Sequence, residues 1–223
     1  MKRLHPLWLV IFVLSLSGSI LVGRVLEAKG GAEQLADEVP YLPSPTFFRY
    51  ASLGYRTMVA DLLWIRTTQY FGKELETPKE REKKYGYLFP LLELTVSLDP
   101  QFIDAYRFGG LLLTVIRRPD QAITLYEKGY AANPDRWENP HDLGRLYYLE
   151  LKDYEKALYW WKITAKLSGR PEYIPRFIAR LYARTGQRET AIELWLEMFH
   201  ATDNMYLRDL IRDELRRLGV QVQ

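Results

Sequence analysis

The chain has 223 residues, of which 48% are hydrophobic and 26% charged, enough for one domain with a substantial core. Its net charge of +3 is mild and argues against a nucleic-acid partner, which would require a denser basic stripe. The absence of cysteine excludes disulfides, cysteine–zinc sites, cysteine nucleophiles and a lipid on an N-terminal cysteine. Because no alternating, strand-like run stands out, the predicted fold class is all-α.

The N-terminus carries an uncharged run from Leu4 to Gly23, preceded by Lys2 and Arg3. A helix of about 20 residues is about 30 Å long, which matches the hydrocarbon thickness of a bilayer. We therefore predict that residues 1–23 are a signal anchor that stays in the cytoplasmic membrane as a single span.

The charges around this run predict its orientation. Basic residues cluster before the run, so the positive-inside rule leaves the N-terminus in the cytosol and places the rest of the chain outside it, in the periplasm of a bacterium. A cleaved signal peptide, with Ser17 and Ser19 as the small residues before the cut, is the alternative and would give a secreted protein.

Residues 24–45 are predicted to be a linker, because Gly30-Gly31 is flexible and three prolines follow. The folded domain is then expected over residues 46–223. Its first helix begins at Thr46 and runs towards Gly54 or beyond. A degenerate helix pair is predicted over about residues 60–100, and its first helix is expected at Ala60–Gly72. The charged segment Lys73–Lys84 follows this helix. Its charges alternate in sign, which favours a helix face exposed to solvent.

Small residues and prolines then recur with a period of about 34 residues. Pro100 and Pro134 share this spacing, as do Gly110 and Gly144. Ala122, Ala157 and Ala191 follow the same rhythm, with one extra residue between the first two. We place that extra residue in the turn near Lys152-Asp153, where an insertion is easiest to accommodate.

The order small residue, aromatic, turn, alanine, aromatic, proline resembles the tetratricopeptide repeat (TPR) family over about residues 101–204. Gly169 and Asp203 stand where proline would close the last two repeats. The resemblance implies a right-handed α-solenoid of antiparallel helix hairpins, with repeats at 103–136, 137–171 and 172–205 and a capping helix at 206–218. The positions expected to be buried between helices are Gly110, Ala122, Gly144, Ala157, Ala179 and Ala191.

The sequence offers little evidence of catalysis. His5, His141 and His200 lack metal-ligand spacing, and neither a nucleophile elbow nor a phosphate loop occurs. His141 is expected to be exposed in the first turn of a repeat helix. We therefore predict a protein that is not an enzyme and that uses no metal, cofactor or small-molecule substrate.

The TPR resemblance also implies a partner-binding groove, because the first helices of TPR hairpins line the concave surface. The implied groove residues are Arg107, Leu111, His141, Arg145, Tyr148, Tyr173, Arg176, Arg180 and Arg184. Their arginines favour a protein partner with an acidic or amphipathic segment. The alternative interpretation is that arginine occupies these positions because it is soluble and forms helices well.

The function predicted from these features is a membrane-tethered TPR scaffold for protein–protein interaction in the cell envelope. Two alternatives stay open at this point. One is an assembly chaperone or enzyme-associated subunit that acts on secreted chains. The other is a structural spacer whose repeats pack within a larger membrane complex.

Overall fold

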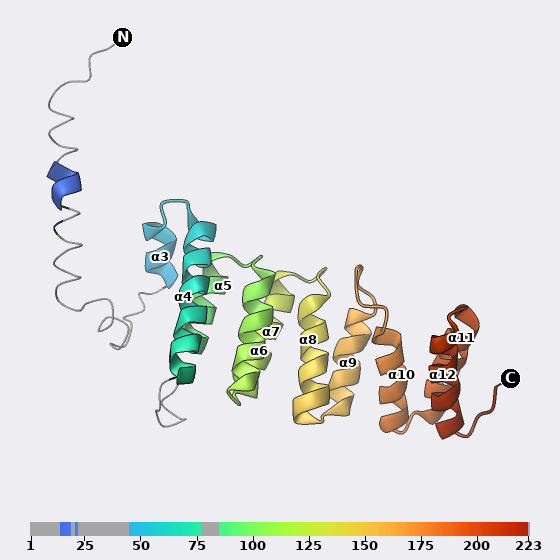
Figure 1. Cartoon of the computed structure of the whole chain (residues 1–223). Helices are drawn as coiled ribbons and strands as arrows, with labels where there is room; N and C mark the ends of the chain where they lie inside the picture. Colours follow the sequence, from blue (N-terminus) through green and yellow to red (C-terminus); the bar gives the residue numbers. More distant parts are fainter. Residues whose placement is uncertain (1–13, 19–20, 22–44, 77–84, 223) are drawn as a thin grey trace, which may run out of the picture. The chain divides into compact units, whose positions relative to one another are not determined.

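The computed structural model describes residues 14–18, 21, 45–76 and 85–222, and the regular secondary structure in these ranges is entirely helical (Figure 1). This confirms the all-α class for the described part of the chain. The predicted signal anchor at 1–23 and linker at 24–45 lie almost wholly outside the described residues. No helix within the described ranges has the length and hydropathy needed to cross a bilayer.

The chain separates into two compact units, and the second, Ser44–Gln223, contains all the helices discussed below. It begins with α3 (Pro45–Ala51), α4 (Arg56–Glu76) and α5 (Leu88–Leu98), with both α3 and α4 packed on α5. The first helix ends earlier than predicted, because Leu53 and Gly54 adopt positive φ angles of 48° and 95°. Most of the charged segment predicted to follow α4 lies outside the described residues.

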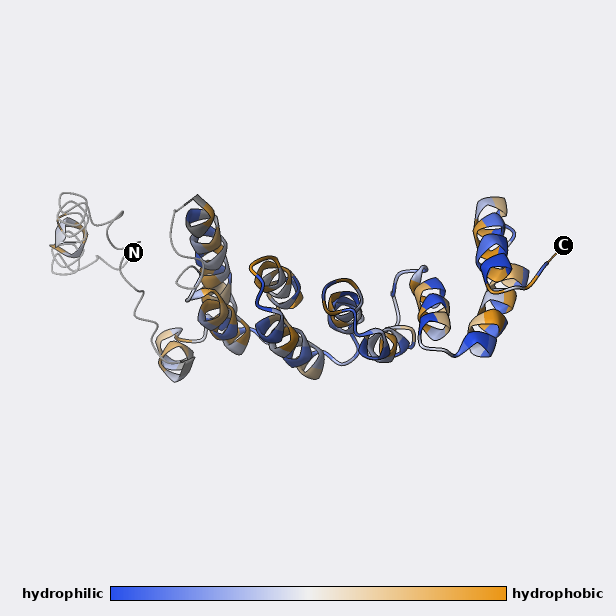
Figure 2. Cartoon of the chain, turned by 90° about the horizontal axis from the view of Figure 1, so that it is seen from below, coloured by the Kyte–Doolittle hydropathy of each residue, from blue (hydrophilic) through white to orange (hydrophobic). Residues whose placement is uncertain are grey.

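Three helix hairpins and a final helix follow in a row (Figures 1 and 2). The helices are α6 (Ile103–Val115), α7 (Pro119–Ala132), α8 (Glu138–Leu146), α9 (Tyr154–Thr164), α10 (Ile174–Arg184), α11 (Arg188–Ala201) and α12 (Met205–Arg217). Each helix packs on the next, which confirms the stacked hairpins that the TPR resemblance implies. The right-handed superhelix stays a prediction.

All six small residues expected between helices are buried. Two of them are glycines for a steric reason. A Cβ atom on Gly110 would lie 2.3 Å from the ring of Tyr126, and one on Gly144 would lie 2.3 Å from the ring of Trp161. Side-chain atoms cannot approach that closely, so each glycine admits an aromatic ring from the second helix of its own hairpin.

The same two rings also make equivalent hydrogen bonds. The Tyr126 hydroxyl donates to the main-chain oxygen of Arg107 over 3.3 Å, and Trp161 Nε1 donates to that of His141 over 3.1 Å. The ring at this position therefore packs on a glycine and holds the start of the first helix. Trp161 is buried, whereas the adjacent Trp160 is only half-buried.

The extra residue of the second repeat was predicted in the wrong place. The structure has a π-helical turn at Tyr147–Leu151 (η1), and a π turn contains one residue more than an α turn. The turn residue Lys152 ends this segment with a φ of 57°, and the Asp153 N–H donates to the Tyr147 carbonyl over 3.0 Å. The insertion therefore lies at the end of the first helix, immediately before the predicted turn.

The predicted capping helix corresponds to α12, which closes a small core of its own. Ile211 and Leu215 are buried against Trp195 and Phe199. The guanidinium groups of Arg208 and Arg212 lie 4.6 and 5.7 Å from the centre of the Phe199 ring. Their apolar stems and planar heads extend the cover over this small core.

Candidate functional site

Helix α8 lies in the middle of the row and carries four buried polar side chains. Counted as whole residues, Glu138, Asn139, His141 and Asp142 are between 0% and 7% exposed. The helix is enclosed because α6, α7 and α9 all pack against it. A polar side chain in such a place needs partners within the protein. Glu138, His141 and Asp142 have them, whereas neither amide atom of the Asn139 side chain makes a hydrogen bond.

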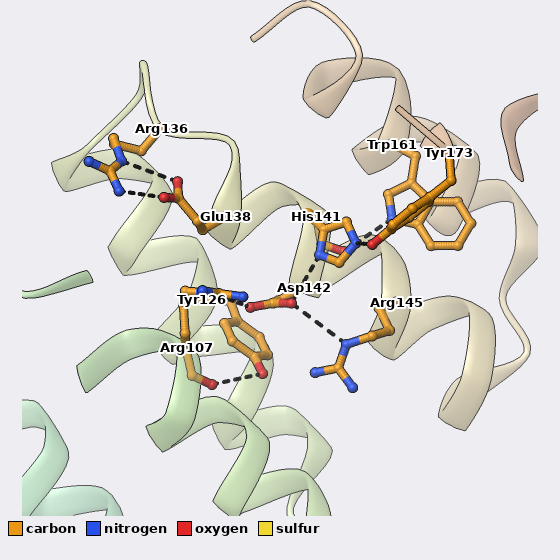
Figure 3. Close-up of polar contacts among 9 residues, drawn as sticks. All are labelled: Arg107, Tyr126, Arg136, Glu138, His141, Asp142, Arg145, Trp161 and Tyr173. Carbon is orange, nitrogen blue, oxygen red and sulfur yellow. Dashed lines mark hydrogen bonds and ion pairs between the residues drawn. The ribbon is translucent and has the colours of Figure 1, made fainter. Parts of the chain in front are cut away.

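Asp142 is the centre of the resulting polar network (Figure 3). Arg107 Nε, on the preceding hairpin, donates to Asp142 Oδ2 over 3.1 Å, and Arg145 Nε lies 3.6 Å from Oδ1. His141 Nδ1 lies 3.0 Å from the same Oδ1 atom. The carboxylate therefore joins two neighbouring hairpins.

The pKa of Asp142 follows from these contacts. Burial is the largest single influence and raises the pKa, because it penalises the charged carboxylate. The hydrogen bond with His141 and the positive charges of Arg107 and Arg145 act in the opposite direction and prevail, so the pKa of Asp142 is lowered. The network is thus built for an ionised carboxylate.

His141 contradicts its prediction as an exposed residue. Its side chain is 9% exposed, and its Nε2 atom lies 2.8 Å from the hydroxyl of Tyr173, at the start of the next hairpin. Burial raises the pKa of Tyr173, so its hydroxyl keeps its proton at neutral pH. The prediction failed because the position seemed to be an open first turn, whereas three hairpins meet there.

The predicted groove residues divide into three groups. Arg107, His141, Arg145 and Tyr173 belong to the polar network. Leu111 on α6 and Arg176 on α10 are half-buried. They belong neither to the polar network nor to the pocket. The remaining three residues, Tyr148, Arg180 and Arg184, come together at that pocket.

The pocket has a volume of about 310 Å³ and lies where α10 and α12 approach η1. We call it the arginine pocket. Its lining residues are Tyr148, Arg180, Ala183, Arg184, Trp195, Glu214, Arg217 and Leu218. Three arginines and one glutamate make the lining cationic, while the aromatic rings and Leu218 supply apolar surface.

Two contacts hold the arginines of this pocket in place. Arg180 Nη2 and Nε lie 2.7 and 2.9 Å from Glu214 Oε1 on α12. The guanidinium of Arg184 lies 4.9 and 5.5 Å from the ring centres of Tyr154 and Tyr148. Arg184 therefore stacks on aromatic rings, and the residue stays exposed.

The sequence analysis missed Glu214 and Arg217, because it gave the last helix only a capping role. A usable signal exists in the repeat period. Arg107 pairs with Asp142 and Arg180 pairs with Glu214, so in both cases an acidic residue follows an arginine at about the repeat spacing.

A second pocket, of about 410 Å³, was not predicted at all. It is lined by Glu155, Leu158, Tyr159, Lys162, Ile163, Lys166, Tyr182 and Gln187. Five of these residues belong to the second helix α9, so this pocket does not lie on the predicted face. Within the described ranges, no group of three or more His, Asp or Glu side chains is arranged to hold a metal ion.

Comparison with protein-family models and with curated proteins gives no match. Similar solved structures include two crystal structures of MamA and one structure of Pseudomonas aeruginosa PilF. The first MamA structure is 17% identical with a TM-score of 0.46 and matches 78% of this chain and 90% of its own. The second MamA structure is 15% identical with a TM-score of 0.46, and the match covers 90% of this chain and 93% of the MamA chain. PilF is 18% identical with a TM-score of 0.44, and the match covers 86% of this chain and 79% of the PilF chain.

Proposed function

We propose that this protein is a helical-repeat scaffold that binds a protein partner through the arginine pocket, with no catalytic step of its own. The observation that carries the proposal is the lining of that pocket. It combines Arg180, Arg184 and Arg217 with the rings of Tyr148 and Trp195, and it has Glu214 as its single acidic residue. An acidic or amphipathic segment is the complementary ligand.

The chemistry of arginine supports this choice of ligand. A guanidinium group can hold a carboxylate with two parallel hydrogen bonds, and it also stacks on aromatic faces. Arg184 already uses its face on two tyrosines and leaves its edge for a carboxylate. Arg217 is 74% exposed and lies 3.5 Å from Glu214, so it is also accessible to a ligand.

The polar network around Asp142 does not enter this proposal as a binding surface. Its carboxylate is 6% exposed and already satisfies Arg107, Arg145 and His141. An incoming acidic group would have to compete with a buried carboxylate for the same donors. We therefore restrict the predicted groove to its C-terminal part and assign the network a structural role.

The expected affinity rests on apolar contact more than on charge. An exposed ion pair contributes about 0–1 kcal/mol, whereas a well-packed aromatic anchor contributes more. The arginines would instead set the rate of encounter and the choice of partner. Binding should therefore weaken with rising salt concentration without being abolished.

The test is the recovery of a partner from detergent-solubilised membranes, with the partner identified by mass. The variant Arg184→Glu/Arg217→Glu reverses the two arginines that hold no buried contact, and Arg170→Glu, an exposed change outside the pocket, is the matched control. We expect the double variant to lose the partner and the control to retain it. Equal recovery with equal salt dependence from all proteins would refute the proposal.

We further propose that residues 1–23 tether this scaffold to the cytoplasmic membrane as a single span, with the repeats outside the cytosol. The support is the uncharged run from Leu4 to Gly23 and the basic residues that precede it. N-terminal sequencing of the mature protein tests the tether. A mature chain that begins at or after Ile20 would show a removed signal and a secreted scaffold.

A further inference from the structure

Helices α3 and α4 and the turn between them expose large apolar side chains. Six residues between 50% and 85% exposed form what we call the apolar stripe: Tyr50, Leu53, Tyr55, Met58, Leu62 and Ile65. Single exposed apolar residues are normal on protein surfaces, but a run of this kind over two neighbouring helices indicates contact with something else.

The stripe has helical periodicity along α4. Met58, Leu62 and Ile65 are four and three residues apart, a spacing that places them on one face of the helix. The opposite face carries Ala60 and Leu63, which are buried. Helix α4 is therefore apolar on both faces, although only one of them is covered by the rest of the unit.

The exposed charges on α4 are mixed. Arg56 and Arg66 are exposed, and Asp61, four residues before Ile65, is exposed on the same face as the stripe. Tyrosines at the edge of an apolar surface are typical of the membrane–water interface, where the ring meets the acyl chains and the hydroxyl meets water. Tyr50 and Tyr55 provide such rings at the start of the stripe.

The position of the stripe in the chain brings it within reach of a bilayer. Residues 24–44 separate the proposed span from α3, and about 21 residues reach at most about 70 Å when fully extended. A tether of this length holds the helix pair close to the membrane at a high effective concentration. Even weak apolar contacts would then be occupied for much of the time.

We propose that the apolar stripe of α3 and α4 lies on the surface of the bilayer and contacts its lipids, an inference that rests on the proposed membrane tether. Contact along a stripe fixes the direction in which the row of hairpins leaves the membrane, which a flexible tether alone would not do. The arginine pocket, at the other end of the repeat unit in sequence, is then presented at a defined orientation.

The lack of cysteine makes a direct test possible, because a single introduced cysteine can carry a polarity-sensitive dye. The test variant is Leu62→Cys in the stripe, and the control is Thr124→Cys, an exposed position on α7. The full chain is reconstituted into vesicles that contain anionic lipid and spin-labelled lipid. We expect blue-shifted emission and quenching by the spin label for the dye at position 62, with neither effect at position 124.

The outcomes separate this inference from the tether on which it depends. A chain that floats with the vesicles while the dye at position 62 emits as it does in water overturns the inference and leaves the tether intact. A blue shift without lipid quenching, accompanied by cross-linking between two copies at position 62, identifies a second copy as the occupant and also overturns it. A chain that does not float with the vesicles refutes the tether itself.

Discussion

Two equivalent ion pairs, one between the first and second hairpins and one between the third hairpin and α12, serve different purposes. Arg107 pairs with Asp142 in the middle of the row, and Arg180 pairs with Glu214 at its end, each at about one repeat spacing. The Asp142 side chain is 6% exposed, whereas that of Glu214 is 15% exposed and borders a pocket. The position of a pair in the row thus decides whether it joins hairpins or lines a surface.

The difference follows from what packs against each pair. Asp142 lies on a helix that contacts three others, and the next hairpin adds Tyr173 to its network. Glu214 lies on α12, the last helix of the described residues, and only α11 packs closely on that helix. A repeat protein therefore gains a stable centre and a more accessible end from similar sequence units.

The largest expected change in stability concerns the contact between Gly144 and the Trp161 ring in the middle hairpin. We predict that Gly144→Ala destabilises the protein by about 1–3 kcal/mol, because its Cβ would overlap the Trp161 ring. Gly72→Ala is the matched control, since that helical glycine has open space around it. The control should stabilise by about 0.5–1 kcal/mol through helix propensity.

Both variants are measured by urea denaturation of the full chain. Equal changes in the free energy of unfolding for the two variants would mean that Gly144→Ala acts through helix propensity alone. The Trp161 ring would then not require a glycine at position 144. Such a result would remove the steric explanation for the small residues of the repeat.

An effect of comparable size is expected at the central carboxylate. We expect Asp142→Asn to cost about 1–3 kcal/mol at neutral pH, because Arg107, Arg145 and His141 lose a buried acceptor with a full charge. Denaturation at pH 7 measures this loss. A cost within the error of the measurement would show that the network is dispensable and would erase the contrast with the end of the row.

The same variant should also change the pH dependence of stability. The folded-state pKa of Asp142 is lowered, so its ionised form stabilises the fold above the unfolded-state value of about 3.8. This contribution is lost as the pH falls through the lowered pKa. The stability difference between wild type and Asp142→Asn should therefore shrink below about pH 4. A difference that is constant between pH 7 and pH 3 would contradict the assignment.

A smaller effect is expected at the end of the row. We predict that Glu214→Gln costs about 0–1 kcal/mol, because Arg180 and Arg217 are partly exposed and can turn to solvent. Thermal unfolding measures the change alongside Asp142→Asn. If Glu214→Gln proved as costly as Asp142→Asn, the two ion pairs would be equivalent and the pocket would be a structural feature.

The sequence predicts the helix pairs and their buried contacts well, because both depend on local periodicity. The spacing of Gly110, Gly144 and Ala179 identified the close approaches between helices without any structure. The sequence could not predict the burial of His141, since that depends on the neighbouring hairpins. It also could not predict the π turn at Tyr147–Leu151, because an added residue can enter either a turn or a helix.

The candidate site was predicted only in part, for a related reason. The face of the first helices was identified from the family resemblance, but which of its arginines are already paired depends on residues one repeat away. Arg107 proved to be bound to Asp142, whereas Arg184 lies on two tyrosine rings at the pocket. Glu214 and Arg217 enter the site only through the packing of α12 on the preceding hairpin.

The most direct test of the central claim is photo-cross-linking from the two pockets of the full chain in membranes. A photoreactive residue replaces Ala183 in the arginine pocket or Tyr159 in the second pocket. We predict that position 183 cross-links to the partner, that Arg184→Glu/Arg217→Glu abolishes this product, and that position 159 gives none. Cross-linking from position 159 alone would place binding on the second helices and contradict the proposed function.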